Sequence, residues 1–170
     1  MIVPPSTPAA FLDRDGVLNV DVGYPHRLED FQAINGAVEA VSSLNTLGYK
    51  VIVVSNQSGV ARGYFGEDAV LGFNHHLQKY YAQHGAVIDH FYYCPFHPQG
   101  SVDAYSQEHD DRKPNAGMIE KAIREHNISR EKSFLIGDKK TDILAAQKAK
   151  ISGFLFNEEN LFDFLKNLPL

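Results

Sequence analysis

Residues 9–17 read Ala-Ala-Phe-Leu-Asp-Arg-Asp-Gly-Val, a short apolar run that ends on two carboxylates, Asp13 and Asp15. An unbroken apolar run is typical of a parallel strand that is covered on both faces. Side chains two positions apart on an extended strand project to the same side, so both acids can address one reacting group. One can act as a nucleophile or metal ligand while the other carries protons. The alternative is a solvated turn that closes the strand, and segments further along the chain decide between the two.

Outward from this stretch, apolar runs alternate with amphipathic segments. The runs predict strands at 9–12, 50–55, 86–94, 133–137 and 153–156, and the amphipathic segments predict helices at 37–47, 67–84, 116–126, 142–150 and 161–168. Strict alternation predicts an α/β fold: a doubly wound parallel sheet in three layers, with helices on both faces and right-handed crossovers.

Length and composition indicate an ordinary globular chain. Its 170 residues suit a single domain, 1–170, and 44% hydrophobic with 22% charged residues is typical of globular proteins. A net charge of -5 gives no electrostatic reason to expect nucleic acid or a membrane surface as a partner. No signal-peptide pattern or membrane-spanning run is present, and the single cysteine, Cys94, suits a reducing compartment. We therefore expect a cytoplasmic protein.

Polar residues gather where the predicted strands end. Asp13 and Asp15 follow the first strand, Ser55 ends the second, and Asp138 follows the fourth. Ligands of doubly wound sheets bind at the carboxyl ends of the strands. The segment 95–114 is unusually long for a loop, which is typical of a lid or binding loop. Together these features predict an active site rather than chance turns.

The residue types favour phosphoryl transfer with magnesium. Asp13, Asp15 and Asp138 offer the hard oxygen ligands that Mg²⁺ prefers. Ser55 can donate to a phosphoryl oxygen, and Lys113 can neutralise the charge that spreads over such oxygens in the transition state. The turn at 55–59 adds backbone N–H donors that lead toward a helix.

The chain carries four motifs: Asp13-Arg14-Asp15-Gly16, Ser55 after an apolar strand, Lys113 before a helix, and Gly137-Asp138-x-x-x-Asp142. In order and spacing they resemble those of the haloacid dehalogenase (HAD) superfamily of phosphatases. Longer strings resemble its branch of heptose bisphosphate and histidinol phosphatases. The match covers almost the whole chain, to about residue 157, and includes FLDRDGVLN (11–19), SNQSGVARG (55–63), YYCP (92–95), HPQGS (97–101), DRKP (111–114) and GDK (137–139). The connections after the first and third predicted strands resemble those of members without a cap domain, in which the 95–114 loop covers part of the opening.

The resemblance implies a role for each matching residue. Asp13 corresponds to the nucleophile that forms an aspartyl-phosphate, and Asp15 to the acid that protonates the leaving oxygen and then activates water. Ser55 and Lys113 correspond to the pair that holds the phosphoryl group. The implied Mg²⁺ ligands are Asp13, the backbone carbonyl of Asp15, and Asp138. Asp142 is expected to support them from a helix N-terminus.

The resemblance also implies residues that bind the substrate, with Arg112 contributing to its recognition. They are Asp21, Val22, Gly23, Tyr24, Asn56, Gln57, Ser58, Arg112 and Lys139.

The function implied by the resemblance is removal of the C7 phosphate of D-glycero-D-manno-heptose 1,7-bisphosphate, in the synthesis of lipopolysaccharide or other surface polysaccharide precursors. The expected partner is a small phosphorylated sugar, and the expected state is a monomer. Histidinol phosphate or another phosphate ester is the alternative substrate. A phospho-accepting receiver module is disfavoured, because receivers have no counterpart of Asp15.

Relatives of this type usually bind a structural zinc in the long loop, through a Cys-x-His pair and a later Cys-x-Cys pair. Here the pairs read Cys94-Pro95-Phe96 and His109-Asp110-Asp111, so only Cys94 remains in place. A rebuilt site from Cys94, His97, His109 and Asp111 is chemically allowed. Because a structural site needs four ligands, we expect no structural zinc and a loop held by packing and hydrogen bonds.

Overall fold

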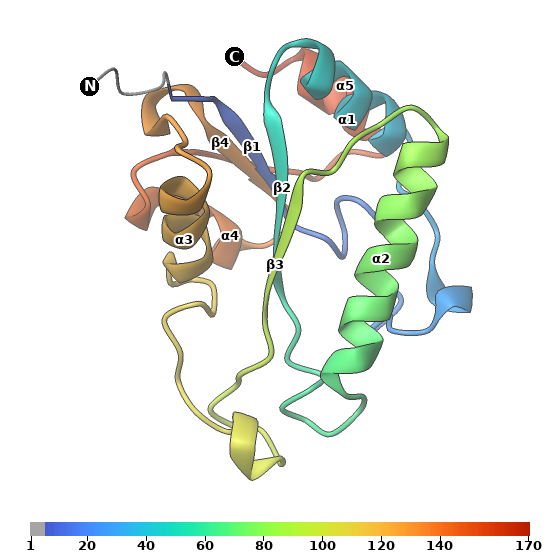
Figure 1. Cartoon of the computed structure of the whole chain (residues 1–170), viewed down its shortest axis with the longest axis vertical. Coiled ribbons are helices and arrows are strands. Elements are labelled where there is room, and N and C mark those ends of the chain that lie inside the picture. The colour runs from blue at the N-terminus through green and yellow to red at the C-terminus, as the bar shows by residue number, and fades with distance from the viewer. Residues whose placement is uncertain (1–5) are drawn as a thin grey trace.

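The structure, a computed structural model, describes residues 6–170 and is built on a five-stranded sheet (Figure 1). The strands lie in the order β3-β2-β1-β4-β5, and every neighbouring pair is parallel. Their bounds are β1 (Ala9–Leu12), β2 (Lys50–Asn56), β3 (His90–Cys94), β4 (Phe134–Gly137) and β5 (Ser152–Leu155). The predicted parallel sheet is therefore confirmed. Residues 1–5 of the predicted domain lie outside the described residues.

Helices cover both faces of this sheet, which gives the three predicted layers (Figure 1). One face packs against α1 (Ala37–Thr46), α2 (Glu67–Gln83) and α5 (Leu161–Lys166), and the other against α3 (Gly117–Glu125) and α4 (Lys140–Lys148). The alternation along β1 explains the division of the core. Ala10 and Leu12 belong to the cluster on the first face, while Ala9 and Phe11 belong to the second. All four are completely buried, as a central parallel strand requires.

Several predicted boundaries shift in the structure, and two elements begin two or more residues from the expected position. The strand expected from residue 86 begins at His90, because the backbone N–H and C=O of Val87 bond to the side chain of Asn45 rather than to a strand. The helix expected from residue 142 begins at Lys140, because the Asp142 carboxylate accepts the N–H of Lys139 (3.1 Å) and so starts the helix earlier. It ends two residues before Lys150, whose φ of 58° is left-handed.

The strand order fixes where a ligand can bind. β1 connects to β2 on one side and hydrogen-bonds to β4 on the other, so the strand order reverses between β1 and β4. The crevice outside their carboxyl ends is the expected ligand site of such a sheet. In Figure 1 the segment 95–114, which follows β3, lies lowest, and the connection between β2 and α2 lies beside it.

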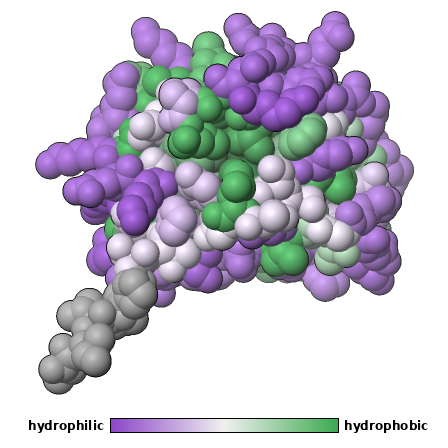
Figure 2. All heavy atoms as spheres, turned by 90° about the horizontal axis from the view of Figure 1, so that it is seen from above, coloured by the Kyte–Doolittle hydropathy of each residue, from purple (hydrophilic) through white to green (hydrophobic). Residues whose placement is uncertain are grey.

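The opposite end of the molecule, where the C-terminus lies in Figure 1, faces the viewer in Figure 2. In this view hydrophobic side chains gather near the middle, and hydrophilic side chains surround them. Within residues 6–170, no helix has the length and apolar character needed to cross a bilayer.

Candidate active site

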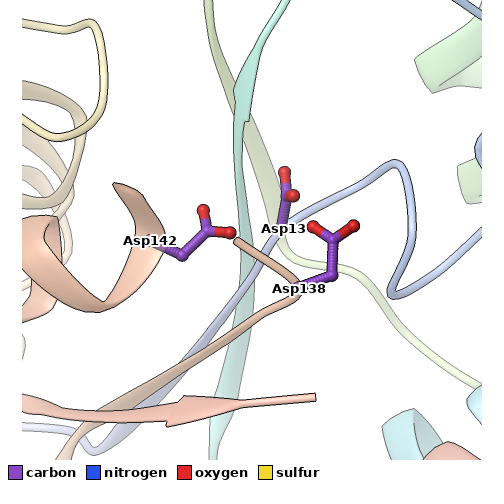
Figure 3. A group of neighbouring side chains, drawn as sticks. All are labelled: Asp13, Asp138 and Asp142. Atoms are coloured by element: carbon purple, nitrogen blue, oxygen red, sulfur yellow. The ribbon is translucent and has the colours of Figure 1, made fainter. Parts of the chain in front are cut away.

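Three carboxylates from separate segments meet at the reversal point of the sheet (Figure 3). Asp13 follows β1, Asp138 follows β4, and Asp142 lies in the first turn of α4. One carboxylate oxygen from each lies within 4.8 Å of the other two. Figure 3 shows the carboxyl groups of Asp13 and Asp138 side by side, with Asp142 reaching in from its helix. The predicted convergence of Asp13 and Asp138 is therefore present.

Two glycines allow these carboxylates to lie directly against the backbone. Gly16 has a φ of +91°, and a Cβ placed on it would lie 2.2 Å from Oδ2 of Asp138. A Cβ on Gly137 would lie 2.2 Å from Cβ and Cγ of Asp142. Neither position can carry a side chain without moving an acid of the site. Both motifs therefore require glycine at these two positions for steric reasons.

Lys113 forms ion pairs with two of these acids, Asp13 and Asp142. It comes from the end of the long loop, is only 3% exposed, and donates from Nζ to Oδ1 of Asp13 (3.0 Å), Oδ1 of Asp142 (2.6 Å) and the carbonyl of Val54 (2.7 Å). The other oxygen of Asp142 accepts the N–H of Lys139. Both oxygens of Asp142 are therefore engaged, in line with its predicted supporting role at a helix N-terminus.

The electrostatics of the group favour an additional cation. Burial raises the pKa of Asp13 well above its usual value; Lys113 opposes this rise, and Asp142 and Asp15 add to it. Burial lowers the pKa of Lys113, but Asp13 and Asp142 together hold it above its ordinary value. Oδ1 of Asp138 is buried and has no hydrogen-bond partner among residues 6–170. An unsatisfied buried oxygen beside two other carboxylates fits a hard divalent cation such as Mg²⁺.

Asp15 lies next to this group but in a different set of contacts. Its Oδ1 accepts from Nε of Arg14 (2.8 Å) and Nδ2 of Asn19 (3.0 Å), and its Oδ2 accepts from Nε2 of Gln57 (3.1 Å). Gln57 also donates to Oγ of the buried Ser55 (2.7 Å). Asp13 and Asp15 both line the same pocket, as their two-residue spacing predicted.

That pocket has a volume of about 390 Å³ and collects most of the predicted site residues. It is lined by Asp13, Asp15, Asp21, Gly23, Tyr24, Asn56, Gln57, Ser58, Arg112, Lys113, Lys139, Thr141 and Asp142. Asp21 and Lys139 lie across from each other, with 3.7 Å between Oδ2 and Nζ. Arg112 donates to the carbonyl of Phe96 (3.4 Å), and burial lowers its pKa.

Three predicted site residues are not part of this lining. Val22 is 55% exposed and lies outside the pocket, between two residues that line it. Ser55 is buried and is covered by Gln57, while Asp138 lies against Asp13 and Gly16. Ser55 and Asp138 thus lie next to residues that line the pocket, Gln57 and Asp13, while a role for Val22 stays a prediction.

Sequence reasoning missed Arg14, Asn19 and Thr141. Arg14 stands between the two acids, is completely buried, and bonds to one of them, Asp15. A fully buried arginine requires several hydrogen-bond acceptors. Its position between two carboxylates was the feature of the sequence that could have indicated a role in holding one of them.

The long loop is held by contacts other than those of a four-ligand site. Phe96 stacks on the ring of His109, with centroids 4.4 Å apart, and Phe96 also packs against Tyr105. Nδ1 of His109 accepts the N–H of Asp111 (3.0 Å), and the carboxylate of Asp111 pairs with Lys121. These contacts support the expected anchoring by packing and hydrogen bonds. The absence of zinc stays a prediction.

Comparisons with known proteins agree with this geometry. The profile of the family described as HAD-hydrolase-like matches residues 111–159. The chain is 48% identical over 143 residues to the D-glycero-beta-D-manno-heptose-1,7-bisphosphate 7-phosphatase of Pasteurella multocida, covering 84% of this chain and 77% of the relative. The enzyme of the same name from Escherichia coli (strain K12) is 42% identical, with 86% and 76% covered.

Solved structures resemble the chain over most of its length. A HAD-like phosphatase from Mesorhizobium loti superposes with a TM-score of 0.85 at 35% identity, covering 91% of this chain and 75% of that one. The D,D-heptose 1,7-bisphosphate phosphatase of B. bronchiseptica, solved with magnesium and phosphate, gives a TM-score of 0.77 at 27% identity, covering 96% and 88%. The chain belongs to the family of the D-glycero-beta-D-manno-heptose-1,7-bisphosphate 7-phosphatases, within the HAD-like hydrolases.

Proposed function

We propose that this chain is a Mg²⁺-dependent phosphatase that removes the C7 phosphate of D-glycero-D-manno-heptose 1,7-bisphosphate, in the synthesis of heptose precursors of surface polysaccharides. The observation that carries the proposal is the convergence of Asp13, Asp138 and Lys113 at the reversal point of the sheet, in a chain that belongs to this family. A nucleophile, an unsatisfied metal-ligand oxygen and a buried cation are the parts that phosphoryl transfer needs.

Each residue has a role in this proposal. Asp13 attacks phosphorus and forms the aspartyl-phosphate, and Asp15 protonates the departing sugar oxygen and then deprotonates the attacking water. Lys113 and Ser55 hold the phosphoryl oxygens; Ser55 accepts from Gln57 and so keeps its own O–H to donate. Mg²⁺ bound by Asp13, the carbonyl of Asp15 and Asp138 would supply positive charge against those oxygens.

The rest of the substrate would contact the pocket wall. Arg112 and Lys139 supply positive charge, and Asp21, Asn56 and Ser58 supply groups for sugar hydroxyls. We assign Gly23, Tyr24 and Gln57 to the same wall, and Val22 to its outer edge. The long loop contributes Arg112 and Lys113, so we propose that it covers part of the opening. We propose that the protein acts as a monomer in the cytoplasm.

A panel of phosphate esters tests the assignment. Purified protein with Mg²⁺ is expected to release one phosphate from the heptose bisphosphate, with the C1 phosphate retained in the product by ³¹P NMR. It should act more slowly on histidinol phosphate and on sugar monophosphates. A higher kcat/KM on histidinol phosphate than on the heptose bisphosphate would identify histidinol phosphate as the substrate instead. A long-lived phosphoprotein after treatment with acetyl phosphate, without turnover, would contradict the phosphatase assignment.

A further inference from the structure

A buried arginine lies beneath the residue assigned as the proton carrier. Arg14 is 0% exposed and makes a bidentate contact with Asp15, in which Nε lies 2.8 Å from Oδ1 and Nη2 lies 3.2 Å from Oδ2. This arrangement fixes the plane of a carboxylate as well as its position. The orientation of Asp15 therefore depends on the orientation of the guanidinium.

The guanidinium is itself held from the side of α2. Nη1 of Arg14 donates to Oδ1 of Asn74 (3.0 Å), and its carbon lies 4.3 Å from the centroid of the Phe73 ring. Nη2 also donates to the carbonyl of Pro25 (3.0 Å), directly after the segment that lines the pocket. Asn74 is 7% exposed and does not line the pocket, so a role for it would be exerted through Arg14.

We propose that Asn74 is a positioning residue: by holding Arg14, it sets the orientation of Asp15 for proton transfer to the leaving oxygen. This inference rests on the proposed phosphatase function. It gives α2 a part in positioning the catalytic acid, although this helix contributes no residue to the pocket lining. Without the oxygen of Asn74 the Arg14 fork can rotate about its remaining acceptors, and the Asp15 carboxyl turns with it.

The test uses leaving groups that differ in their need for a proton. A sugar alkoxide leaves poorly unless an acid protonates it, whereas a nitrophenolate leaves without help. The value of kcat/KM reports the first phosphoryl transfer for each substrate when that step is irreversible. A misplaced Asp15 therefore lowers kcat/KM for a sugar phosphate and leaves that for p-nitrophenyl phosphate nearly unchanged. A merely structural role would lower both together.

The variants are Asn74→Leu, which removes the acceptor at similar volume, and Asn74→Asp, which keeps it. Gln78→Leu is the matched control, because Gln78 lies one turn further along α2 and donates its amide to the carbonyl of Ile88 (3.0 Å), away from Arg14. All are compared by thermal unfolding to confirm folding. Arg14→Lys, which loses the fork, is a second variant closer to the site.

For Asn74→Leu we expect about a tenfold loss of kcat/KM on the heptose bisphosphate and less than about a twofold loss on p-nitrophenyl phosphate. Asn74→Asp should keep kcat/KM on the heptose bisphosphate near that of the unmodified protein. Gln78→Leu should change kcat/KM on either substrate by no more than about twofold. Equal losses on both substrates, or no loss on either, would overturn the positioning role while leaving the phosphatase assignment intact. If the unmodified protein hydrolyses neither ester with Mg²⁺, the proposed function fails, and this inference fails with it.

Discussion

Lys113→Met should lower the free energy of unfolding strongly, because Lys113 neutralises buried negative charge. The side chain is 3% exposed and bonds to two buried carboxylates, those of Asp13 and Asp142. Methionine has a similar length but leaves both acids without a cation. Removing one partner of a buried ion pair costs about 3–5 kcal/mol. In a chain of this size that corresponds to a fall of about 6–20 °C in Tm.

The loss should also depend on pH. The pKa of Asp13 is already raised by burial, and without Lys113 it should rise further. A carboxyl whose folded pKa lies above its unfolded value binds more protons when folded, so stability falls as pH rises. We therefore expect Lys113→Met to lose more stability at pH 8 than at pH 5.

Urea unfolding with a chelator present, to keep divalent cations off the carboxylates, measures this effect. Lys139→Met is the matched control: its side chain is 60% exposed and 3.7 Å from Asp21, so we expect a change below about 1 kcal/mol. Adding Asp142→Asn to Lys113→Met should recover about 1–3 kcal/mol, because it removes one of the two unbalanced charges. A cost below about 1 kcal/mol for Lys113→Met, or no recovery in the double variant, would refute the charge-balance argument.

The remaining predictions concern the site and the loop. Asp13→Asn should leave the fold intact and lower turnover at least about 1,000-fold, because a carboxamide cannot form the acyl phosphate; near-normal phosphate release would contradict the nucleophile. Asp15→Asn should slow sugar phosphate hydrolysis by about 10²–10⁴-fold, and chelation should stop the unmodified enzyme until Mg²⁺ is restored. Arg112→Ala should lower kcat/KM at least about tenfold more for the heptose bisphosphate than for an aryl phosphate, and equal losses would remove Arg112 as a specificity residue. Elemental analysis of protein purified without chelator should find no stoichiometric zinc, and tightly held zinc whose removal unfolds the 95–114 loop would show a rebuilt site.

Local patterns were sufficient for the architecture. Runs such as residues 50–55 are apolar throughout because a central parallel strand is buried on both faces, and Lys50–Asn56 is a strand in the structure. The errors fell at element ends, where side chains compete with regular hydrogen bonding. Asn45 captures the backbone of Val87, and the Asp142 carboxylate starts its helix early.

The chemistry of the site was also visible in the sequence, because the reacting groups stand at strand ends and parallel strands end at one edge. Asp13 and Asp138 could be placed together without coordinates. The spacing of two acids gave Asp15 the same pocket. For Val22, which is 55% exposed and lies between two residues that line the pocket, a role in substrate binding stays a prediction.

The sequence by itself determined the parallel α/β sheet, the acids and the Lys113 cation at its edge, and the family, since each depends on neighbours in the chain or on strand direction. Only the tertiary structure decided which oxygen of each acid is occupied and which is free. Lys113 lies 100 positions from Asp13 and bonds to it, and Arg14 lies 60 positions from Asn74 and bonds to it. Oδ1 of Asp138 has no hydrogen-bond partner in the part of the chain that the structure describes. Such contacts depend on how whole helices pack against the sheet, and a pattern of neighbouring residues carries no record of that packing.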